Sequence, residues 1–236
     1  ALTGHGGWPM TIIMTPDAKP FFTGTYFPKH DRMGLPGLIT ILDRIHKMWK
    51  EDRRKILDTA NSIVSAVSVM EEPSGFLDYK ALTDTAFRMY KQSFDEIYGG
   101  FGNAPKFPTP HILLFLLRYW KLTGESEALK MAEKTLESMR RGGIFDHIGF
   151  GFSRYSTDRQ WLVPHFEKML YDNALLAIAY LEAYQATGNI SYARTAEQIF
   201  AYVLRDMVSP EGGLYSAEDA DSEAEDGHME EGRFYT

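Results

Sequence analysis

The pattern of apolar and polar positions divides the chain into a short strand-rich start and a longer helical remainder. β-Branched and aromatic side chains, bounded by proline and glycine, occupy residues 11–14 and 21–28, and this pattern predicts a β-hairpin. Apolar residues then recur at helical spacing over 38–49 and 56–67. The hairpin is therefore expected to be followed by two helices or by one long bent helix.

A linker is predicted between these elements and the rest of the chain. Segment 71–75 combines two acidic residues with a helix-stopping proline and a flexible glycine, which is typical of a connection between domains. We therefore expect one domain over residues 1–72 and a second domain over residues 73–236.

Two kinds of helix alternate in the second domain. Segments 83–98, 125–140 and 191–207 each carry a single apolar stripe, whereas segments 110–122 and 166–187 are apolar over most of their circumference. A helix that is apolar on every side must be surrounded by other helices. The chain is therefore expected to form outer and inner helices in turn.

Glycines mark the connections between these helices. Thr-Gly pairs at 123–124 and 187–188 predict that each inner helix ends on a glycine in the left-handed conformation. Gly-Gly followed by an apolar residue recurs at 99–101, 142–144 and 212–214, which indicates an internal repeat in the longer connections. We expect all the long loops to lie at one end of the helical array, where functional residues usually gather.

Composition and charge exclude several functional classes. The chain is 44% hydrophobic and 24% charged, with a formal net charge of −7, so we expect a globular protein that does not bind nucleic acid. No apolar run approaches the roughly 20 residues of a membrane span, so no membrane partner is expected. The chain has no cysteine, so it has no thiol chemistry of its own, and a cytoplasmic location is expected. Motifs of zinc proteases, nucleotide hydrolases and serine hydrolases are absent, and we expect no cofactor and no metal.

The densest group of polar side chains falls within residues 144–172. Pro164 is expected in the first turn of an inner helix, which would place His165 and Glu167 at the N-terminus of that helix. The helix dipole lowers the pKa of a carboxylate there, and such a position suits a general acid or base. We assign catalysis to His165, Glu167 and Asp158. The alternative is that Glu167 only caps the helix and His165 only binds a loop carbonyl.

Other residues that are expected at the same end of the helical array are assigned to substrate binding. Trp161 beside Asp158 is typical of an aromatic platform that stacks on a sugar ring, although a tryptophan at a loop end also serves for packing. Lys106 is a candidate for an anionic substrate group, and the alternative is a loop that only covers the core. The predicted substrate-binding residues are Arg154, Trp161, Asp172, Asp219 and Asp221.

The acidic segment 216–223 allows three interpretations. Because it follows the third Gly-Gly pair, Asp219 and Asp221 are expected to join Glu167 in a site with paired carboxylates. The segment also resembles the start of a calcium loop, but Ala224 stands where an EF-hand needs glycine. A solvated loop is the third interpretation.

Several longer stretches resemble one protein family. They are GGWPMTIIMTPDAKPFFTGTYFP, GGFGNAPKFP, FSRYSTDRQWLVPHFEKMLYDNALL and GGLYSAEDADSE. These stretches resemble the conserved thioredoxin-domain proteins typified by spermatogenesis-associated protein 20 and its bacterial relatives. The resemblance implies a mostly α fold, in which the C-terminal half of a thioredoxin-like α/β domain precedes the first hairpins of a six-hairpin α/α toroid. Such toroids are similar to those of sugar epimerases and glycosidases.

The resemblance also implies what the protein does. It implies a cis-proline at Pro9, but the Cys-x-x-Cys segment of the family is absent, so we expect a fragment without redox activity of its own. The first hypothesis is an epimerase- or glycosidase-like enzyme that acts on a small carbohydrate. The alternatives are a thiol-redox or redox-sensing protein with the toroid as a binding scaffold, and a scaffold without catalysis. Exposed inner helices predict aggregation or a homo-oligomer.

Overall fold

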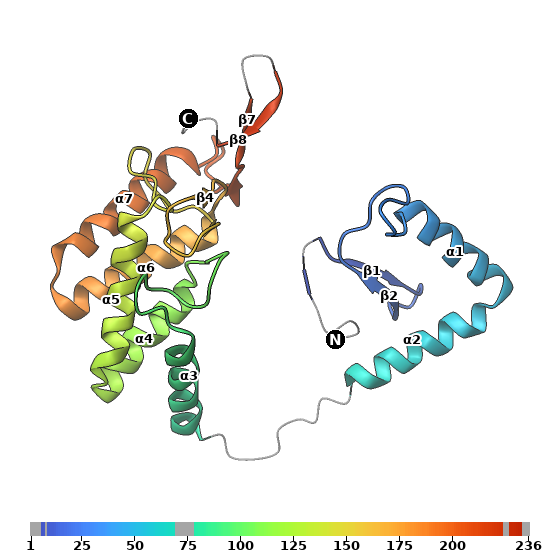
Figure 1. Ribbon diagram of the computed structural model, residues 1–236, viewed down its shortest axis with the longest axis horizontal. Helices are drawn as coiled ribbons and strands as arrows, with labels where there is room; N and C mark the ends of the chain where they lie inside the picture. The colour runs from blue at the N-terminus through green and yellow to red at the C-terminus, as the bar shows by residue number, and fades with distance from the viewer. Residues whose placement is uncertain (1–5, 8, 69–77, 224–226, 233–236) are drawn as a thin grey trace. The chain divides into compact units, whose positions relative to one another are not determined.

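The computed structural model describes residues 6–7, 9–68, 78–223 and 227–232, and the chain forms two compact units (Figure 1). Unit 1 comprises Ala1–Leu77 and unit 2 comprises Asp78–Thr236. The predicted linker at 71–75 lies outside the described residues. The same is true of Trp8, so the expected cis bond between Trp8 and Pro9 is not described.

Unit 1 consists of a hairpin followed by two helices. Strands β1 (Thr11–Met14) and β2 (Pro20–Gly24) pair antiparallel, as the sequence predicts. Helices α1 (Leu38–Glu51) and α2 (Arg53–Ser68) are separate because Asp52 leaves the helical conformation, with φ −146° and ψ 56°. The two-helix alternative is therefore correct. Helix α2 packs against β2 and α1 and buries Ile56 and Ala60.

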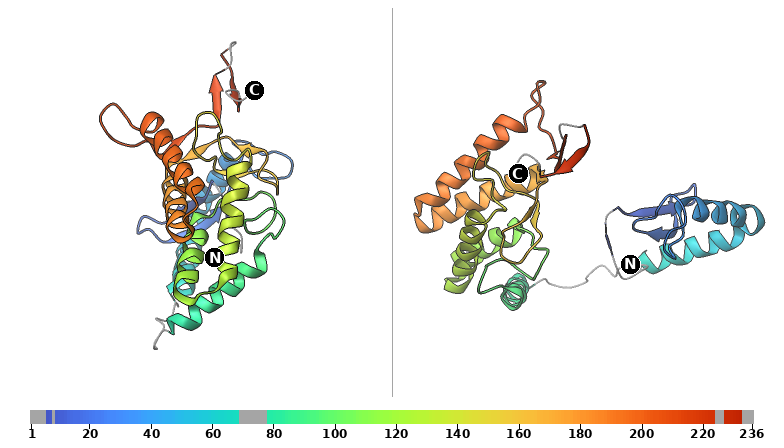
Figure 2. Two further views of the ribbon diagram at one scale, coloured as in Figure 1. Left: turned by 90° about the vertical axis from the view of Figure 1, so that its left-hand side faces the viewer. Right: turned by 45° about the horizontal axis from the view of Figure 1, so that its top comes forward.

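Unit 2 is an array of helices with long loops at one end. Its described residues contain the helices α3 (Tyr79–Ser93), α4 (Pro110–Thr123), α5 (Ser126–Arg141), α6 (Leu170–Thr187) and α7 (Ile190–Asp206). Helices α4 and α6 pack against each other, while α5 packs on α4 and α7 packs on α6 (Figures 1 and 2). This arrangement confirms the predicted alternation of outer and inner helices. Gly124 and Gly188 end the two inner helices at φ 77° and 72°, also as predicted.

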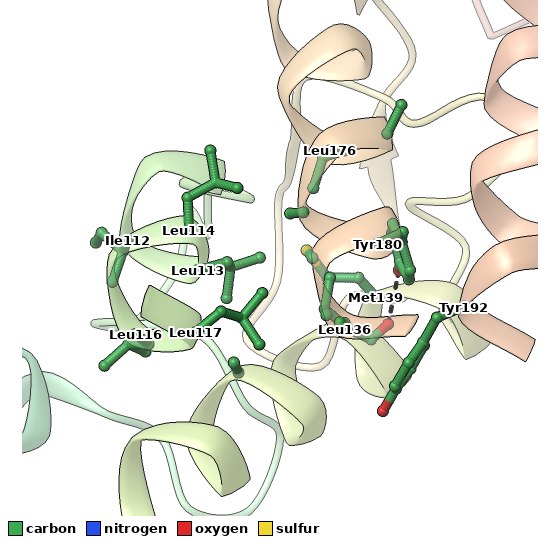
Figure 3. Packing of buried hydrophobic residues seen from close by; sticks show 14 of the residues in the cluster. Ile112, Leu113, Leu114, Leu116, Leu117, Leu136, Met139, Leu176, Tyr180 and Tyr192 are labelled. Atoms are coloured by element: carbon green, nitrogen blue, oxygen red, sulfur yellow. Dashed lines mark hydrogen bonds between the residues drawn. The ribbon is translucent and has the colours of Figure 1, made fainter. Parts of the chain in front are cut away.

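The core of unit 2 forms where α4, α5 and α6 meet (Figure 3). Leu113 and Leu116 of α4, Leu136 of α5 and Tyr180 of α6 are all fully buried. Burial of each such leucine side chain contributes about 2 kcal/mol to folding. The Tyr180 hydroxyl donates a 2.8 Å hydrogen bond to the Leu136 carbonyl oxygen, so this buried polar group is satisfied.

The end of α3 differs from the sequence prediction. The predicted helix over 83–98 begins earlier, at Tyr79, and ends at Ser93. The Asp95 carboxylate accepts hydrogen bonds of 3.1 Å from the backbone N–H groups of Ile97 and Tyr98, which turns the chain away from the helix. Ile97, predicted on the apolar stripe, is exposed.

Two turns of unit 2 repeat the same structure, and they contain the sequences FDEIYGGF (94–101) and FDHIGFGF (145–152). The Asp95 and Asp146 N–H groups donate to the carbonyl oxygens of Gly100 and Gly151, at 2.9 and 3.0 Å. Both glycines have positive φ, 77° and 78°. The predicted repeat at 142–144 is therefore wrong, because Gly151, and not Gly143, corresponds to Gly100.

Each of these aspartates binds a buried lysine. Lys106 Nζ lies 2.7 Å from Asp95 Oδ2 and donates to the Gly99 carbonyl at 2.8 Å. Lys168 Nζ lies 2.8 Å from Asp146 Oδ2 and donates to the Phe150 carbonyl at 3.0 Å. The ammonium groups also face the rings of Trp161 and Tyr202, at 5.3 and 4.5 Å from the ring centroids.

We predict that Lys106→Met destabilises unit 2 strongly. The substitution keeps the apolar stem but leaves the buried Asp95 carboxylate with Arg159 as its remaining cationic partner, which should cost about 3 kcal/mol. Lys91→Met is the matched control, because Lys91 is half exposed and pairs with Glu127 on the surface. Urea denaturation followed by circular dichroism measures both. Equal losses in the two variants would contradict the prediction.

Candidate functional site

The three long loops of unit 2 meet at one end of the helical array, as the sequence predicts. Lys106 and Ser156 form a β-bridge with two backbone hydrogen bonds of 2.8 Å, which joins the first loop to the second. Strand β5 (Lys168–Met169) pairs antiparallel with β6 (Ala217–Glu218), which joins the second loop to the third. The loops are therefore held together by backbone pairing.

The residues before α6 form strands instead of the predicted helix start. Pro164 and His165 form β4 (Pro164–His165), which pairs with β3 (Tyr155–Ser156), and α6 begins only at Leu170. The expected place of His165 and Glu167 at a helix N-terminus is therefore wrong. The pairing of Tyr155 with His165 stacks their rings at a centroid distance of 4.9 Å.

Glu167 lies between a guanidinium and an imidazole. Arg154 Nη1 donates to Glu167 Oε2 at 2.8 Å, and the Arg154 N–H donates to the Glu167 carbonyl oxygen at 2.7 Å. His165 Nε2 is 3.7 Å from the same Oε2. His165 Nδ1 lies 2.7 Å from Glu231 Oε1, and because a carboxylate only accepts hydrogen bonds, we assign the proton to Nδ1. The alternative role of His165, a bond to a loop carbonyl, is not what the structure shows.

Asp172 is a buried acid next to this group. It lies in the first turn of α6, and only 8% of the residue is exposed. Burial raises the pKa of Asp172 to about 6, with a further rise from the negative charge of Glu167, and the positive charge of Arg154 only partly opposes the increase. Asp172 is therefore partly protonated near neutral pH, although a helix N-terminus by itself favours the ionised form.

The site therefore brings together four of the predicted residues: Arg154, His165, Glu167 and Asp172. Two carboxyl groups occupy different environments, because Glu167 is ion-paired while Asp172 is buried without an ion pair among the described residues. Carboxyl groups in contrasting environments are an arrangement suited to general acid and base catalysis.

Asp158 is occupied by its own loop. Its carboxylate accepts backbone N–H groups from Gln160 and Val163 at 2.6 Å and from Leu162 at 3.2 Å. Burial raises the pKa of Asp158, but these hydrogen bonds, with that of Val163 largest, outweigh it and hold the pKa below its ordinary value. The side chain of Asp158 therefore shapes the loop, and Asp158 is not among the residues that the structure brings together around Glu167.

Trp161 and Lys106 also belong to the interior. Trp161 is fully buried, and its indole N–H donates to the Tyr98 carbonyl oxygen at 2.9 Å. A sugar ring has no access to such a side chain, so the predicted stacking platform is wrong and the packing alternative is correct. Lys106 is fully buried against Asp95, so its side chain does not face a substrate.

The acidic segment 216–223 does not supply the predicted residues, but the hairpin that begins in it brings Glu231 to the site. Asp219 and Asp221 are exposed, and neither forms a hydrogen bond or ion pair with Glu167 in the described part of the chain. Strand β7 (Asp221–Glu223) pairs with β8 (Met229–Glu231), and Glu231 of β8 contacts His165. Glu231 could not be predicted from the sequence, because no residue spacing links it to His165 before the hairpin is known. The described residues contain no group of three potential metal ligands, and Ala224 of the calcium interpretation lies outside them.

Comparisons with known proteins agree with this architecture. Residues 1–68 match the family model Thioredox_DsbH, described as "Protein of unknown function, DUF255". Across its full length the chain is 46% identical to spermatogenesis-associated protein 20 of Homo sapiens and of Mus musculus. The chain belongs to the family typified by these proteins. It spans 31% of the length of each of these two relatives. An uncharacterized protein of Caenorhabditis elegans is 42% identical over 94% of the chain and 31% of its own length.

Solved structures resemble more than half of the chain. A sugar epimerase from a ruminal bacterium matches 56% of this chain and 37% of its own, with a TM-score of 0.51 and 19% identity. The cellobiose 2-epimerase of Bacillus thermoamylovorans matches 59% of this chain and 40% of its own, with a TM-score of 0.52 and 16% identity. A family 76 glycoside hydrolase (mannosidase) of Bacteroides thetaiotaomicron matches 65% and 43%, with a TM-score of 0.52 and 16% identity.

At these identities the likeness concerns the fold alone. The fold is that of an α/α toroid, and the family match assigns the hairpin and helices of unit 1 to a thioredoxin-like domain. The predicted fold class, the C-terminal half of a thioredoxin-like domain followed by the first toroid hairpins, is confirmed. Within the described residues, no helix combines the length and apolar character needed to cross a bilayer.

We predict that Asp172→Asn changes the pH dependence of stability. The pKa of Asp172 is about 6 in the folded protein and about 4 in an unfolded chain, so the folded state binds more protons between these values. The contribution of Asp172 to the free energy of unfolding should therefore fall by about 3 kcal/mol as the pH rises from 4 to 7. Asparagine does not titrate, so the variant should gain stability relative to the wild type over this window. Urea denaturation at several pH values measures the difference, and a constant difference would contradict the raised pKa.

Proposed function

We propose that unit 2 binds a small carbohydrate at the end of the helical array where its three long loops meet, which we call the loop end. There it carries out proton transfer in an epimerase- or glycosidase-like reaction. The observation that supports this most is the convergence of Arg154, His165, Glu167 and Asp172 on one surface built by the second loop and α6. The structural neighbours include sugar epimerases and a mannosidase, and this favours a carbohydrate among small-molecule substrates.

In this proposal Asp172 is the general acid. A catalytic group is most effective when its pKa lies near the working pH, and Asp172 meets this condition because its pKa is raised to about 6. His165 is the complementary base: Glu231 binds Nδ1, which fixes the tautomer and leaves Nε2 to accept a proton. Glu167 orients Arg154 and His165, and it stabilises the imidazolium when His165 is protonated.

A panel of neutral mono- and disaccharides tests the proposal with the intact chain. Binding is measured by ligand-observed NMR, and epimerised or hydrolysed products are measured by chromatography. We predict that Asp172→Asn and His165→Gln each lower the rate by about 10²-fold or more, because each removes a proton-transfer group. Glu211→Gln, in an exposed turn, is the control and should react like the wild type. The proposal fails if the wild type neither binds nor converts any sugar, or if all variants react equally.

A second candidate is a thiol-redox or redox-sensing protein whose toroid serves as a binding scaffold. The match of residues 1–68 to a thioredoxin-type family favours it. These 236 residues contain no cysteine, so the redox step itself would have to come from thiols outside them. Under this candidate the toroid only binds, and substitution of Asp172 or His165 would change no rate of sugar conversion.

A further inference from the structure

Most of the lysine and arginine side chains in the long loops of unit 2 form ion pairs with buried carboxylates. In the described part of segments 99–109, 142–169 and 207–232, the lysines and arginines are Lys106, Arg154, Arg159 and Lys168. Asp95 binds both Lys106 and Arg159, the latter through two hydrogen bonds of 2.6 and 2.9 Å. Asp146 binds Lys168. Arg154 is therefore the cation of this set that faces the candidate site.

Arg154 has the chemistry of an anion-binding residue, but Glu167 already occupies it. A guanidinium presents five N–H donors in a planar fork that matches a carboxylate or a phosphate. The Nη1 group donates to Glu167 at 2.8 Å, while the buried Nε has no hydrogen-bond partner among the described residues. The side chain of Arg154 is 34% exposed, so a ligand can approach the guanidinium. Without Glu167, the same guanidinium would be available to a phosphate or carboxylate group.

The surroundings of Arg154 add further negative charge. Glu231 reaches His165 from β8, and Asp172 lies on α6 beside Glu167. An anionic ligand at this place would meet the charges of Glu167 and Glu231 and one guanidinium that is already paired. Hydroxyl groups, in contrast, can donate to these carboxylates without charge repulsion.

We infer that Glu167 determines the charge selectivity of the site: by holding Arg154 in an ion pair, it makes the site accept uncharged sugars and reject sugar phosphates and uronic acids. This inference rests on the proposed function and adds the substrate class to it. Glu167 acts on specificity through Arg154.

The test compares two variants that remove the same charge from different places. The ligands are glucose, mannose and galactose with the 6-phosphate and the uronic acid of each, and titration calorimetry at pH 7 and low salt measures their affinities. Wild type should bind the neutral sugar at least 10-fold more tightly than its anionic derivatives. In Glu167→Gln this ratio should fall at least 10-fold, because Arg154 is released. Glu231→Gln removes one repelling charge but leaves the Glu167–Arg154 pair in place, so the ratio should fall less than 3-fold.

Each other outcome has a distinct meaning. If the wild type binds a sugar phosphate as tightly as the neutral sugar, the inference is wrong while sugar binding stands. Equal changes in the two variants would mean that overall charge, and not the release of Arg154, sets the ratio, and would also overturn it. Absence of binding by every ligand would remove the proposed function and this inference together.

Two further measurements guard against misfolding. Adding Arg154→Gln to Glu167→Gln must abolish the gained affinity for the 6-phosphate, and circular dichroism checks the fold of each variant. In the wild type, added salt should weaken the discrimination against the anionic derivatives, because screening reduces the repulsion. Discrimination that is independent of salt would contradict an electrostatic origin even if a variant does not fold.

Discussion

Two buried ion pairs, Asp95 with Lys106 and Asp146 with Lys168, hold the loop end of unit 2 together. Burial of a charged group costs several kcal/mol, and the attraction between partners offsets this only where further hydrogen bonds satisfy both groups. Both pairs meet this condition. Each carboxylate also accepts two backbone N–H groups of its own turn, and each ammonium also donates to a backbone carbonyl. Burial raises the pKa of Asp95, but the hydrogen bonds from Arg159 and Lys106 outweigh it and keep the carboxyl ionised.

The position of the candidate site follows from these pairs. Lys106 carries the β-bridge to Ser156, and Lys168 carries the strand pairing to Glu218, so each buried lysine also fixes the next loop. Tyr155 precedes the first of these contacts, and Glu167 precedes the second. The backbone of the second loop is thereby fixed on both sides of the site, which is the condition for holding catalytic groups in a defined geometry. The buried lysines also explain why glycine is needed at positions 100 and 151. A Cβ there would lie 2.5 Å from the ring of Trp161 or Tyr202, respectively, which are the rings that face the two ammonium groups.

Helices were predictable from the sequence because their signal is periodic. A helix with one apolar stripe packs on one side, and a helix that is apolar over most of its circumference packs on several sides. The alternation of outer and inner helices could therefore be predicted, and so could the Thr-Gly pairs at which the inner helices end. The turn after α3 could not, because Asp95 competes with the helix through two hydrogen bonds that depend on its partners being in place. The short strands at 164–169 were missed for a similar reason. Two-residue strands have no periodicity, and their partners lie elsewhere in the same loop, at 155–156, and in the third loop, at 217–218.

Residue types predicted that the site contains acidic and basic groups, but they did not predict which residues form it. Asp158 and Trp161 fit a sugar site by type, yet the first is saturated by backbone N–H groups and the second is packed over Lys106. What separates Asp172 from Asp158 is therefore the balance of burial against hydrogen bonding. Burial raises the pKa of both carboxyls, but the N–H groups around Asp158 favour its ionised form, whereas for Asp172 only the charge of Arg154 opposes the effect of burial. An acid whose pKa is raised toward neutral pH can therefore be recognised from its surroundings, because hydrogen bonds from backbone N–H groups shift the pKa of the same kind of side chain in the opposite direction.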